Sequence, residues 1–268
     1  MPGEQIRLAD LLAALSVATD LGNGQEPEKA IRACLVATEL ARRTGEPEAR
    51  VSDVYYTALL RHLGCTATAH EESYVGGDEL VSRPSAERAD FGNPREVFAL
   101  VLQTGRGTGL NRPKHLTRAL RLGKKGDRAI LGAICEVGAR LAERLGLGSA
   151  VRDALYQVFE RWDGKGPHGL IGEAIGLPAQ LAEVGHQAVI FDRLGGPDSA
   201  VEMIRRRSGG GSIQVLPRPS PDSGPPSWAR SKHGTPGRRC STPSPSRGAR
   251  SDRRALMGWP GRLPTWST

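Results

Sequence analysis

Apolar residues recur every three to four positions over most of the first 208 residues, which is the period of an amphipathic helix. Segment 27–45 begins at a proline and ends at a glycine, as helices often do. Its apolar face consists of Ile31, Cys34, Leu35, Thr38 and Ala41. Similar stripes predict helices over 8–21, 51–63, 130–145, 151–160, 178–194 and 198–207. The alternation typical of β-strands is absent, so the sequence predicts an all-α fold, a helical bundle.

Segment 72–126 interrupts this pattern. Gly, Pro and Arg are frequent in it, and only short helical stretches remain at 95–102 and 115–122. We interpret it as a loosely ordered insertion in one helical domain that spans residues 7–208. The arginines at 205–207 end the last predicted helix, where the helix dipole favours cations, so we expect them to be solvated.

The composition changes at residue 209. Residues 213–268 contain ten of the nineteen prolines and lack Glu, Phe, Tyr and Asn. Such a segment cannot bury enough apolar surface to offset the entropy of ordering, so we predict that 209–268 is a disordered tail. Three interpretations stay open: a basic arm that binds nucleic acid or acidic partners, a solvated linker, or out-of-frame translation of a GC-rich gene.

The net charge of +8 belongs to this tail. Residues 213–268 hold ten Lys or Arg against two Asp, so the other 212 residues hold 27 of the 37 basic and 27 of the 29 acidic side chains. The neutral helical domain therefore gives no reason to expect nucleic-acid binding, except through the tail. No apolar run approaches the roughly 20 residues that span a bilayer, and no signal-peptide pattern is present, so we expect a cytoplasmic protein.

The four cysteines are scattered without a C-x-x-C pair, which argues against a zinc knuckle or a disulfide framework. We expect Cys34, Cys65, Cys135 and Cys240 to be reduced and buried.

The segment between two predicted helices, E-R-W-D-G-K-G-P-H-G-L-I-G-E-A-I at 160–175, contains four glycines and a proline and must be a tightly turned loop. We expect Asp163 to accept hydrogen bonds from backbone amides at the turn, and Gly164 and Gly166 to adopt positive φ. Glu160 and Glu173 are predicted to cap neighbouring helix ends.

This loop resembles the signature of the HD-GYP branch of the HD-domain phosphohydrolases, which usually reads HHExxDGxGYPxGLxGExI. The matching residues are Glu160, Asp163, Gly164, Gly166, Pro167, Gly169, Leu170, Gly172, Glu173 and Ile175. Two departures stand out. The two histidines that open the motif, both metal ligands in the family, are Val158 and Phe159 here, and the tyrosine is missing between Gly166 and Pro167.

The resemblance also places the other metal ligands. The first histidine of the family falls on Lys29, the His-Asp dyad falls on Arg61 and His62, and a later aspartate falls on His186. Family members bind iron or manganese and use a metal-bound hydroxide to attack phosphorus. Lys29 and Arg61 should exclude the metals, because like charges a few Å apart repel by about 4 kcal/mol even at an effective dielectric constant near 20.

The resemblance implies an HD-like domain without catalysis, closest to the degenerate N-terminal half of actinobacterial tandem HD-GYP and LuxR-type regulators. Such a domain would sense, dock or dimerise, with a protein partner, a second copy or a nucleotide as ligand. One alternative is an active phosphodiesterase on cyclic di-GMP, in which His62, His186 and His70 hold a divalent metal such as iron, manganese or zinc. The other is a nucleic-acid-binding regulator that acts through the basic tail.

Overall fold

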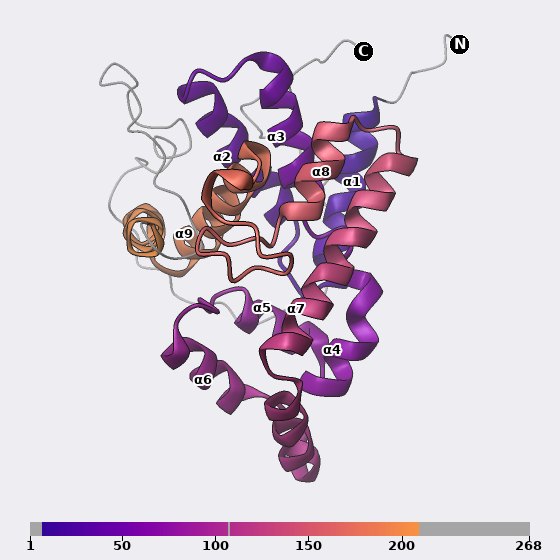
Figure 1. Ribbon diagram of the computed structural model, residues 1–268, viewed down its shortest axis with the longest axis vertical. Coiled ribbons are helices and arrows are strands. Elements are labelled where there is room, and N and C mark those ends of the chain that lie inside the picture. The colour runs from indigo at the N-terminus through magenta and orange to yellow at the C-terminus, as the bar shows by residue number, and fades with distance from the viewer. Residues whose placement is uncertain (1–6, 107, 209–268) are drawn as a thin grey trace, which may run out of the picture. The chain divides into compact units, whose positions relative to one another are not determined.

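The structure, a computed structural model, describes residues 7–106 and 108–208, and it is helical throughout these ranges apart from turns and loops (Figure 1). None of the described residues forms a strand, although an isolated bridge joins Asp163 and Ile171. The all-α prediction is confirmed. The helices are α1 (Leu8–Gly22), α2 (Lys29–Arg43), α3 (Glu48–Leu60), α4 (Ala69–Gly76), α5 (Glu79–Ala86), α6 (Pro94–Gln103), α7 (Arg112–Arg144), α8 (Ser149–Gln157) and α9 (Leu177–Arg207). Short 3-10 turns occupy Cys65–Thr68, Gly109–Asn111 and Gly172–Ala174.

Helix α2 packs against both α3 and α9, and a glycine allows α9 to approach it closely. A Cβ added at Gly185 of α9 would lie 2.4 Å from the carbonyl oxygen of Ala33 and 3.0 Å from the Cβ of Ala37. Both alanines are buried on α2. Because packed interiors leave no room for an added methyl group at such distances, glycine sets the spacing of α2 and α9. The contact also fixes the position of His186, the next residue.

A second close approach holds the turn after α3. A Cβ at Gly64 would lie 2.1 Å from the carbonyl oxygen of Ile134 in α7. The turn that carries Arg61 and His62 therefore lies directly against the α7 backbone. This contact therefore places Arg61 and His62, which align with two metal ligands of the family.

The two long helices are each broken at a glycine. Helix α9 bends at Gly196 (φ 80°, ψ −177°), immediately before Pro197, which agrees with the two separate helices predicted over 178–194 and 198–207. Helix α7 bends at Gly123 (φ 54°), and the helix predicted over 130–145 forms its later part. A positive φ of this kind is available to glycine without steric cost.

Most of segment 72–126, predicted as a loosely ordered insertion, is helical in the structure. The predicted stretches 95–102 and 115–122 lie in α6 and α7, but the sequence pattern missed α4 and α5. Asp78 and Asn93 cap α5 and α6 by accepting hydrogen bonds from the amides of Leu80 and Arg95. The pattern was weak because α5 contains Pro84 and because much of this region remains partly exposed.

The expectation of a solvated cationic helix end is wrong for one of its three arginines. Arg205 and Arg206 are exposed, but Arg207 is 4% exposed and lies over the ring of Phe191. It donates to the side chain of Gln187 and to the backbone carbonyl of Arg88, at 2.6 Å for the latter. These partners lie far away in sequence, so the local pattern could not reveal them.

Three of the four cysteines lie in the described ranges and none of the three forms a disulfide. Cys34 and Cys135 are buried as predicted, whereas Cys65 is half-buried. Cys240 and the predicted disordered tail, 209–268, lie outside the described residues. Among the helices that the structure describes, none combines the length and apolar character needed to cross a membrane.

Candidate functional site

Glu160 organises the loop that joins α8 to α9. Its fully buried carboxylate accepts hydrogen bonds from the amides of His168, at 2.6 Å, and Leu170, at 3.0 Å. The His168 Nδ1 atom lies 3.0 Å from the same carboxylate. The prediction that Glu160 caps a helix end is therefore wrong: α8 ends at Gln157, and Glu160 lies beyond it, where it binds amides of the loop itself.

Glu173 caps no helix end either. Its side chain is exposed, in the 3-10 turn Gly172–Ala174, and it makes no hydrogen bond to another residue that the structure describes. The amide of Gly176, at the start of α9, is capped instead by the side-chain oxygen of Gln157, at 2.7 Å. Gln157 is well placed for this because it ends the preceding helix.

The loop glycines serve two different purposes. Positive φ values occur at Gly164 (72°), Gly169 (74°) and Gly172 (58°). The expectation of positive φ at Gly166 is wrong, because that residue is needed for space: an added Cβ would lie 2.4 Å from Glu160 Oε2 and 2.9 Å from the amide nitrogen of Arg161. Pro167 lies beside Gly132 of α7, and Leu170 packs on buried Ala154, Ile175 and Ala179.

Asp163 holds the start of the loop, as predicted, by accepting from the backbone amide of Lys165 at 3.1 Å. It also receives two hydrogen bonds of 3.0 Å from the Arg161 guanidinium and one of 3.0 Å from Lys165 Nζ. Burial alone would raise the pKa of Asp163, but the hydrogen bonds from Arg161 and Lys165 outweigh it and lower this pKa to about 2. Asp163 therefore stays ionised.

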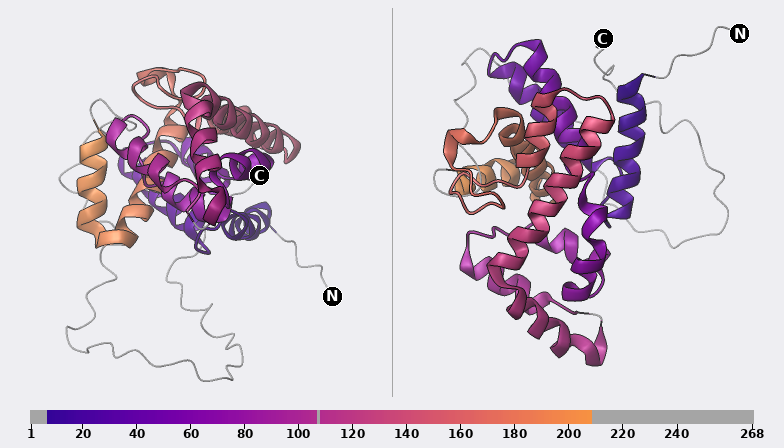
Figure 2. Two further views of the ribbon diagram at one scale, coloured as in Figure 1. Left: turned by 90° about the horizontal axis from the view of Figure 1, so that it is seen from below. Right: turned by 45° about the vertical axis from the view of Figure 1, so that its right-hand side comes forward.

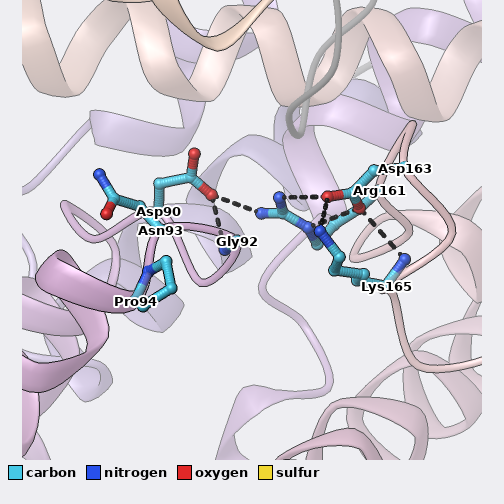
Figure 3. Close-up of a pocket in the computed structure, with 7 residues that line it drawn as sticks. All are labelled: Asp90, Gly92, Asn93, Pro94, Arg161, Asp163 and Lys165. Carbon is cyan, nitrogen blue, oxygen red and sulfur yellow. Dashed lines mark hydrogen bonds and ion pairs between the residues drawn. The ribbon is translucent and has the colours of Figure 1, made fainter.

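Arg161 links this loop to the segment after α5, because its Nη1 atom donates to Asp90 Oδ1 at 2.7 Å (Figure 3). An open pocket of about 340 Å³ lies at this junction. Its lining residues are Asp90, Gly92, Asn93, Pro94, Arg161, Asp163 and Lys165. The charged lining groups are paired with one another, so they offer no unsatisfied charge to a ligand.

The positions that align with the family's metal ligands converge from distant parts of the chain. Lys29 begins α2, Arg61 and His62 follow α3, the Val158–Phe159 pair follows α8, and His186 lies in α9. The rings of His62 and His186 are 4.8 Å apart between centroids, and the rings of His62 and Phe159 are 6.3 Å apart. The alignment from sequence thus corresponds to one buried centre.

Lys29 occupies this centre as a buried cation. Its ammonium group lies 2.6 Å from Glu87 Oε2, and the other Glu87 oxygen lies 3.4 Å from His62 Nε2. Burial lowers the pKa of Lys29, and the charge and hydrogen bond of Glu87 oppose that shift. Sequence reasoning missed Glu87, which lies in the segment taken as an insertion. The one available signal was that a buried Lys29 requires a carboxylate partner.

Arg61 is the second buried cation of the centre. Its guanidinium donates to the Glu183 carboxylate and to the backbone carbonyl of Val158, and it lies 4.7 Å from the centroid of the Phe159 ring. Val158 and Phe159, which align with the two histidines of the family's loop motif, thus both contact Arg61. Glu183 was also missed, although it precedes His186 by three residues and so shares its helix face.

The two histidines of the centre are buried and uncharged. The pKa of each is lowered well below 6.5, by burial first and then by the positive charges of Lys29 and Arg61. His62, His186 and Glu87 offer three ligand atoms within 4.8 Å of one another, so the described residues contain a triad that could hold one metal ion. His70 does not belong to it, because it is exposed on α4. Glu87 takes the third position instead.

These residues do not fit the two-metal centre that the family resemblance implies. A dication bound by the triad would lie close to the Lys29 ammonium, because that ammonium is 2.6 Å from one carboxylate oxygen of Glu87. Repulsion between a dication and one such charge at 4 Å is about 8 kcal/mol at an effective dielectric constant near 20. The site is therefore arranged as a network of ion pairs.

No protein-family model matches the chain. Over 206 residues, 75% of this chain and 45% of the relative, the sequence is 26% identical to the 3'3'-cGAMP-specific phosphodiesterase 3 of Vibrio cholerae serotype O1. A crystal structure of the V. cholerae cyclic GMP-AMP specific phosphodiesterase V-cGAP3 matches with a TM-score of 0.56 and 24% identity, over 77% of this chain and 45% of that chain. The chain thus spans less than half the length of the relatives it matches. The similarity and the loop motif together support a relation of this chain to the HD-GYP/HD phosphohydrolase superfamily.

Proposed function

We propose that this domain is an HD-GYP-like module that has lost metal-dependent catalysis and serves a signalling protein as a sensory, docking or dimerisation domain. The observation that carries the proposal is the pair of buried cations, Lys29 and Arg61, at positions that hold metal ligands in the family. Each has its own carboxylate, Glu87 and Glu183. A fold held by such pairs does not need metals to neutralise its buried acids.

The retained loop agrees with a structural role. Glu160 and Asp163 use their carboxylates to bind loop amides and arginine, and Gly166 provides room for Glu160. All of these contacts stabilise the loop without a substrate. The motif can therefore persist in a domain that carries out no hydrolysis.

The test combines metal analysis with activity assays on the purified full chain. We expect no stoichiometric iron or manganese, and no hydrolysis of cyclic di-GMP, 3'3'-cGAMP or bis-(p-nitrophenyl) phosphate when either metal is added. Binding of the two cyclic dinucleotides, measured by calorimetry, would distinguish a nucleotide sensor from a docking domain. Two metals per chain together with turnover would contradict the proposal.

A second candidate is a metal-dependent phosphohydrolase with an unusual ligand set, and the triad of His62, Glu87 and His186 favours it. This candidate requires that turnover depend on the triad. His186→Ala should then abolish hydrolysis, whereas His70→Ala, a change on the exposed side of α4, should not. Activity that survives in His186→Ala would point to a contaminating enzyme.

A further inference from the structure

Helix α1 has an exposed face that is mostly apolar, with the ion pair of Arg7 and Asp10 at its start. After Arg7, each exposed position of the helix carries leucine, alanine or glycine. Four leucines on this face are strongly exposed: Leu8 at 41%, Leu11 at 57%, Leu15 at 38% and Leu21 at 57%. The charged residues of the helix are Asp10, which pairs with Arg7, and Asp20, which is buried. Such a continuous apolar stripe is typical of a contact surface.

The inward face of α1 is already used by the fold and does not explain this stripe. It buries Ala9, Leu12, Ser16 and Asp20 against the rest of the domain. A large exposed apolar helix face is normally covered by a partner. In the right-hand view of Figure 2, α1 (indigo) lies at the edge of the described helices, where a partner can reach it.

The sizes of the side chains indicate what covers this face. A central row of exposed residues has large side chains in its first half, Leu11 and Leu15, and small ones in its second half, Ala18 and Gly22. A Cβ added at Gly22 would meet nothing within 4 Å, so the space above it is free. When a second α1 lies antiparallel on the first, the leucines of each copy face the small residues of the other. Alternation of large and small residues across an interface is what close packing requires.

Two further exposed residues fit the same arrangement. Ala14 and Leu21 lie together on one flank of the central row, so that Leu21 of one copy lies beside Ala14 of the other. Antiparallel helices also place the positive end of one helix dipole near the negative end of the next. Parallel helices would place Leu11 against Leu11 and leave the small residues facing one another.

We propose that a second copy of this chain docks on α1, with the two α1 helices antiparallel about a two-fold axis. This names the partner for the docking and dimerisation role proposed above and rests on that role. Its evidence, however, comes from α1 and not from the buried ion pairs. Loss of catalysis and dimerisation are thus tested by different measurements, and one can fail while the other stands.

The first experiment measures the mass of the full chain by sedimentation equilibrium over a range of concentrations. We expect a monomer–dimer equilibrium. Leu11→Glu should raise the dimer dissociation constant at least about tenfold, because it places a charge in the centre of the stripe. The matched control is Leu120→Glu, on a residue of α7 that is 66% exposed, and it should leave the constant unchanged. Circular dichroism checks that both variants remain folded.

The second experiment tests the antiparallel orientation by disulfide cross-linking. Chains with Leu11→Cys and chains with Gly22→Cys are oxidised separately and as a mixture, and the unsubstituted chain controls for the native cysteines. We expect a cross-linked dimer from the mixture and little from either variant alone. A monomer at every concentration, a dimer that Leu11→Glu does not weaken, or efficient cross-linking of Leu11→Cys with itself would overturn the proposal.

Discussion

The ammonium group of Lys29 lies 2.6 Å from a carboxylate oxygen of Glu87, and the two residues are 58 positions apart in the sequence. The pair ties the first residue of α2 to the segment that follows α5. Both side chains are largely buried, and the second oxygen of Glu87 faces His62. An internal cation therefore neutralises the carboxylate that could otherwise serve as a metal ligand.

This relationship predicts the behaviour of Lys29→Met. The variant keeps the apolar part of the side chain but leaves the Glu87 charge without its partner, which should lower the free energy of unfolding by about 3 kcal/mol. With the ammonium removed, Glu87, His62 and His186 become available to zinc, which accepts nitrogen and oxygen ligands. Zinc should thus raise the melting temperature of the variant, since a ligand of the folded state stabilises it.

The comparison proteins are the unsubstituted chain and Lys165→Met. Lys165 also pairs with a carboxylate, that of Asp163, but its side chain is 58% exposed, so its loss should cost less than about 1 kcal/mol. Zinc should leave both melting temperatures unchanged. If zinc stabilised the unsubstituted chain as strongly as it stabilises Lys29→Met, the inference that Lys29 excludes metal would be wrong.

Glu160→Gln tests the hydrogen bonds inside the loop. The two carboxylate oxygens accept from two different amides, so an amide side chain must present its NH2 group to one of these donors. We expect the free energy of unfolding to fall by about 1–3 kcal/mol, as is usual when a buried donor loses its acceptor. Chemical denaturation provides the measurement.

Glu173→Gln is the matched control, because Glu173 belongs to the same motif but is exposed. It should change the free energy of unfolding by less than about 0.5 kcal/mol. Equal losses for the two variants would mean that the motif glutamates act through their charge and not through the loop amides.

Gly166→Ala tests the close approach inside the loop. Its new methyl group would meet the backbone of Glu160 and Arg161 at 2.7 and 2.9 Å, so the loop would have to shift, and we expect a loss of about 1–3 kcal/mol. Gly138→Ala in α7 is the opposite case, since a Cβ there meets nothing within 4 Å. The control should gain up to about 1 kcal/mol from the helix propensity of alanine. Thermal denaturation of both variants measures the difference, and a neutral Gly166→Ala would show that this approach is not tight.

Local patterns predicted the parts of the fold that depend on neighbouring residues. The helix predicted over 27–45 is α2, Lys29–Arg43, and the break predicted between 194 and 198 occurs at Gly196. The stripe that defines α2 is strong because one face packs on α3 and α9. Where helices are short and partly exposed, as α4 and α5 are, the same pattern fades and the prediction failed.

The candidate site could be located from the sequence but not completed. The family resemblance implied that Lys29, Arg61, His62 and His186 lie together, because aligned residues keep their positions on a shared fold. The partner of Lys29 and His62 was beyond reach, since Glu87 lies in a segment without a helical pattern, whereas Glu183, the partner of Arg61, lies in a predicted helix. A contact between residues far apart in the chain, such as Arg161 with Asp90, leaves no trace in local periodicity.

The neutral histidines of the centre predict how stability depends on pH. The pKa of His186 is lowered well below 6.5 in the folded chain, by burial first and then by the charges of Lys29 and Arg61. Below pH 6.5 the unfolded chain therefore binds a proton there that the folded chain does not. The free energy of unfolding should therefore fall as the pH is lowered, by up to about 1.4 kcal/mol per pH unit for this residue.

His186→Gln removes that proton, so its free energy of unfolding should decline less steeply between about pH 6.5 and 5. Asp20, whose pKa burial raises to about 6, acts in the opposite direction, but it is present in both proteins and cancels in the comparison. Urea denaturation at a series of pH values measures the slopes, with His70→Gln on the exposed side of α4 as the control. Parallel curves for His186→Gln and the unsubstituted chain would mean that His186 is protonated in the folded protein, and the centre would then hold a third cation.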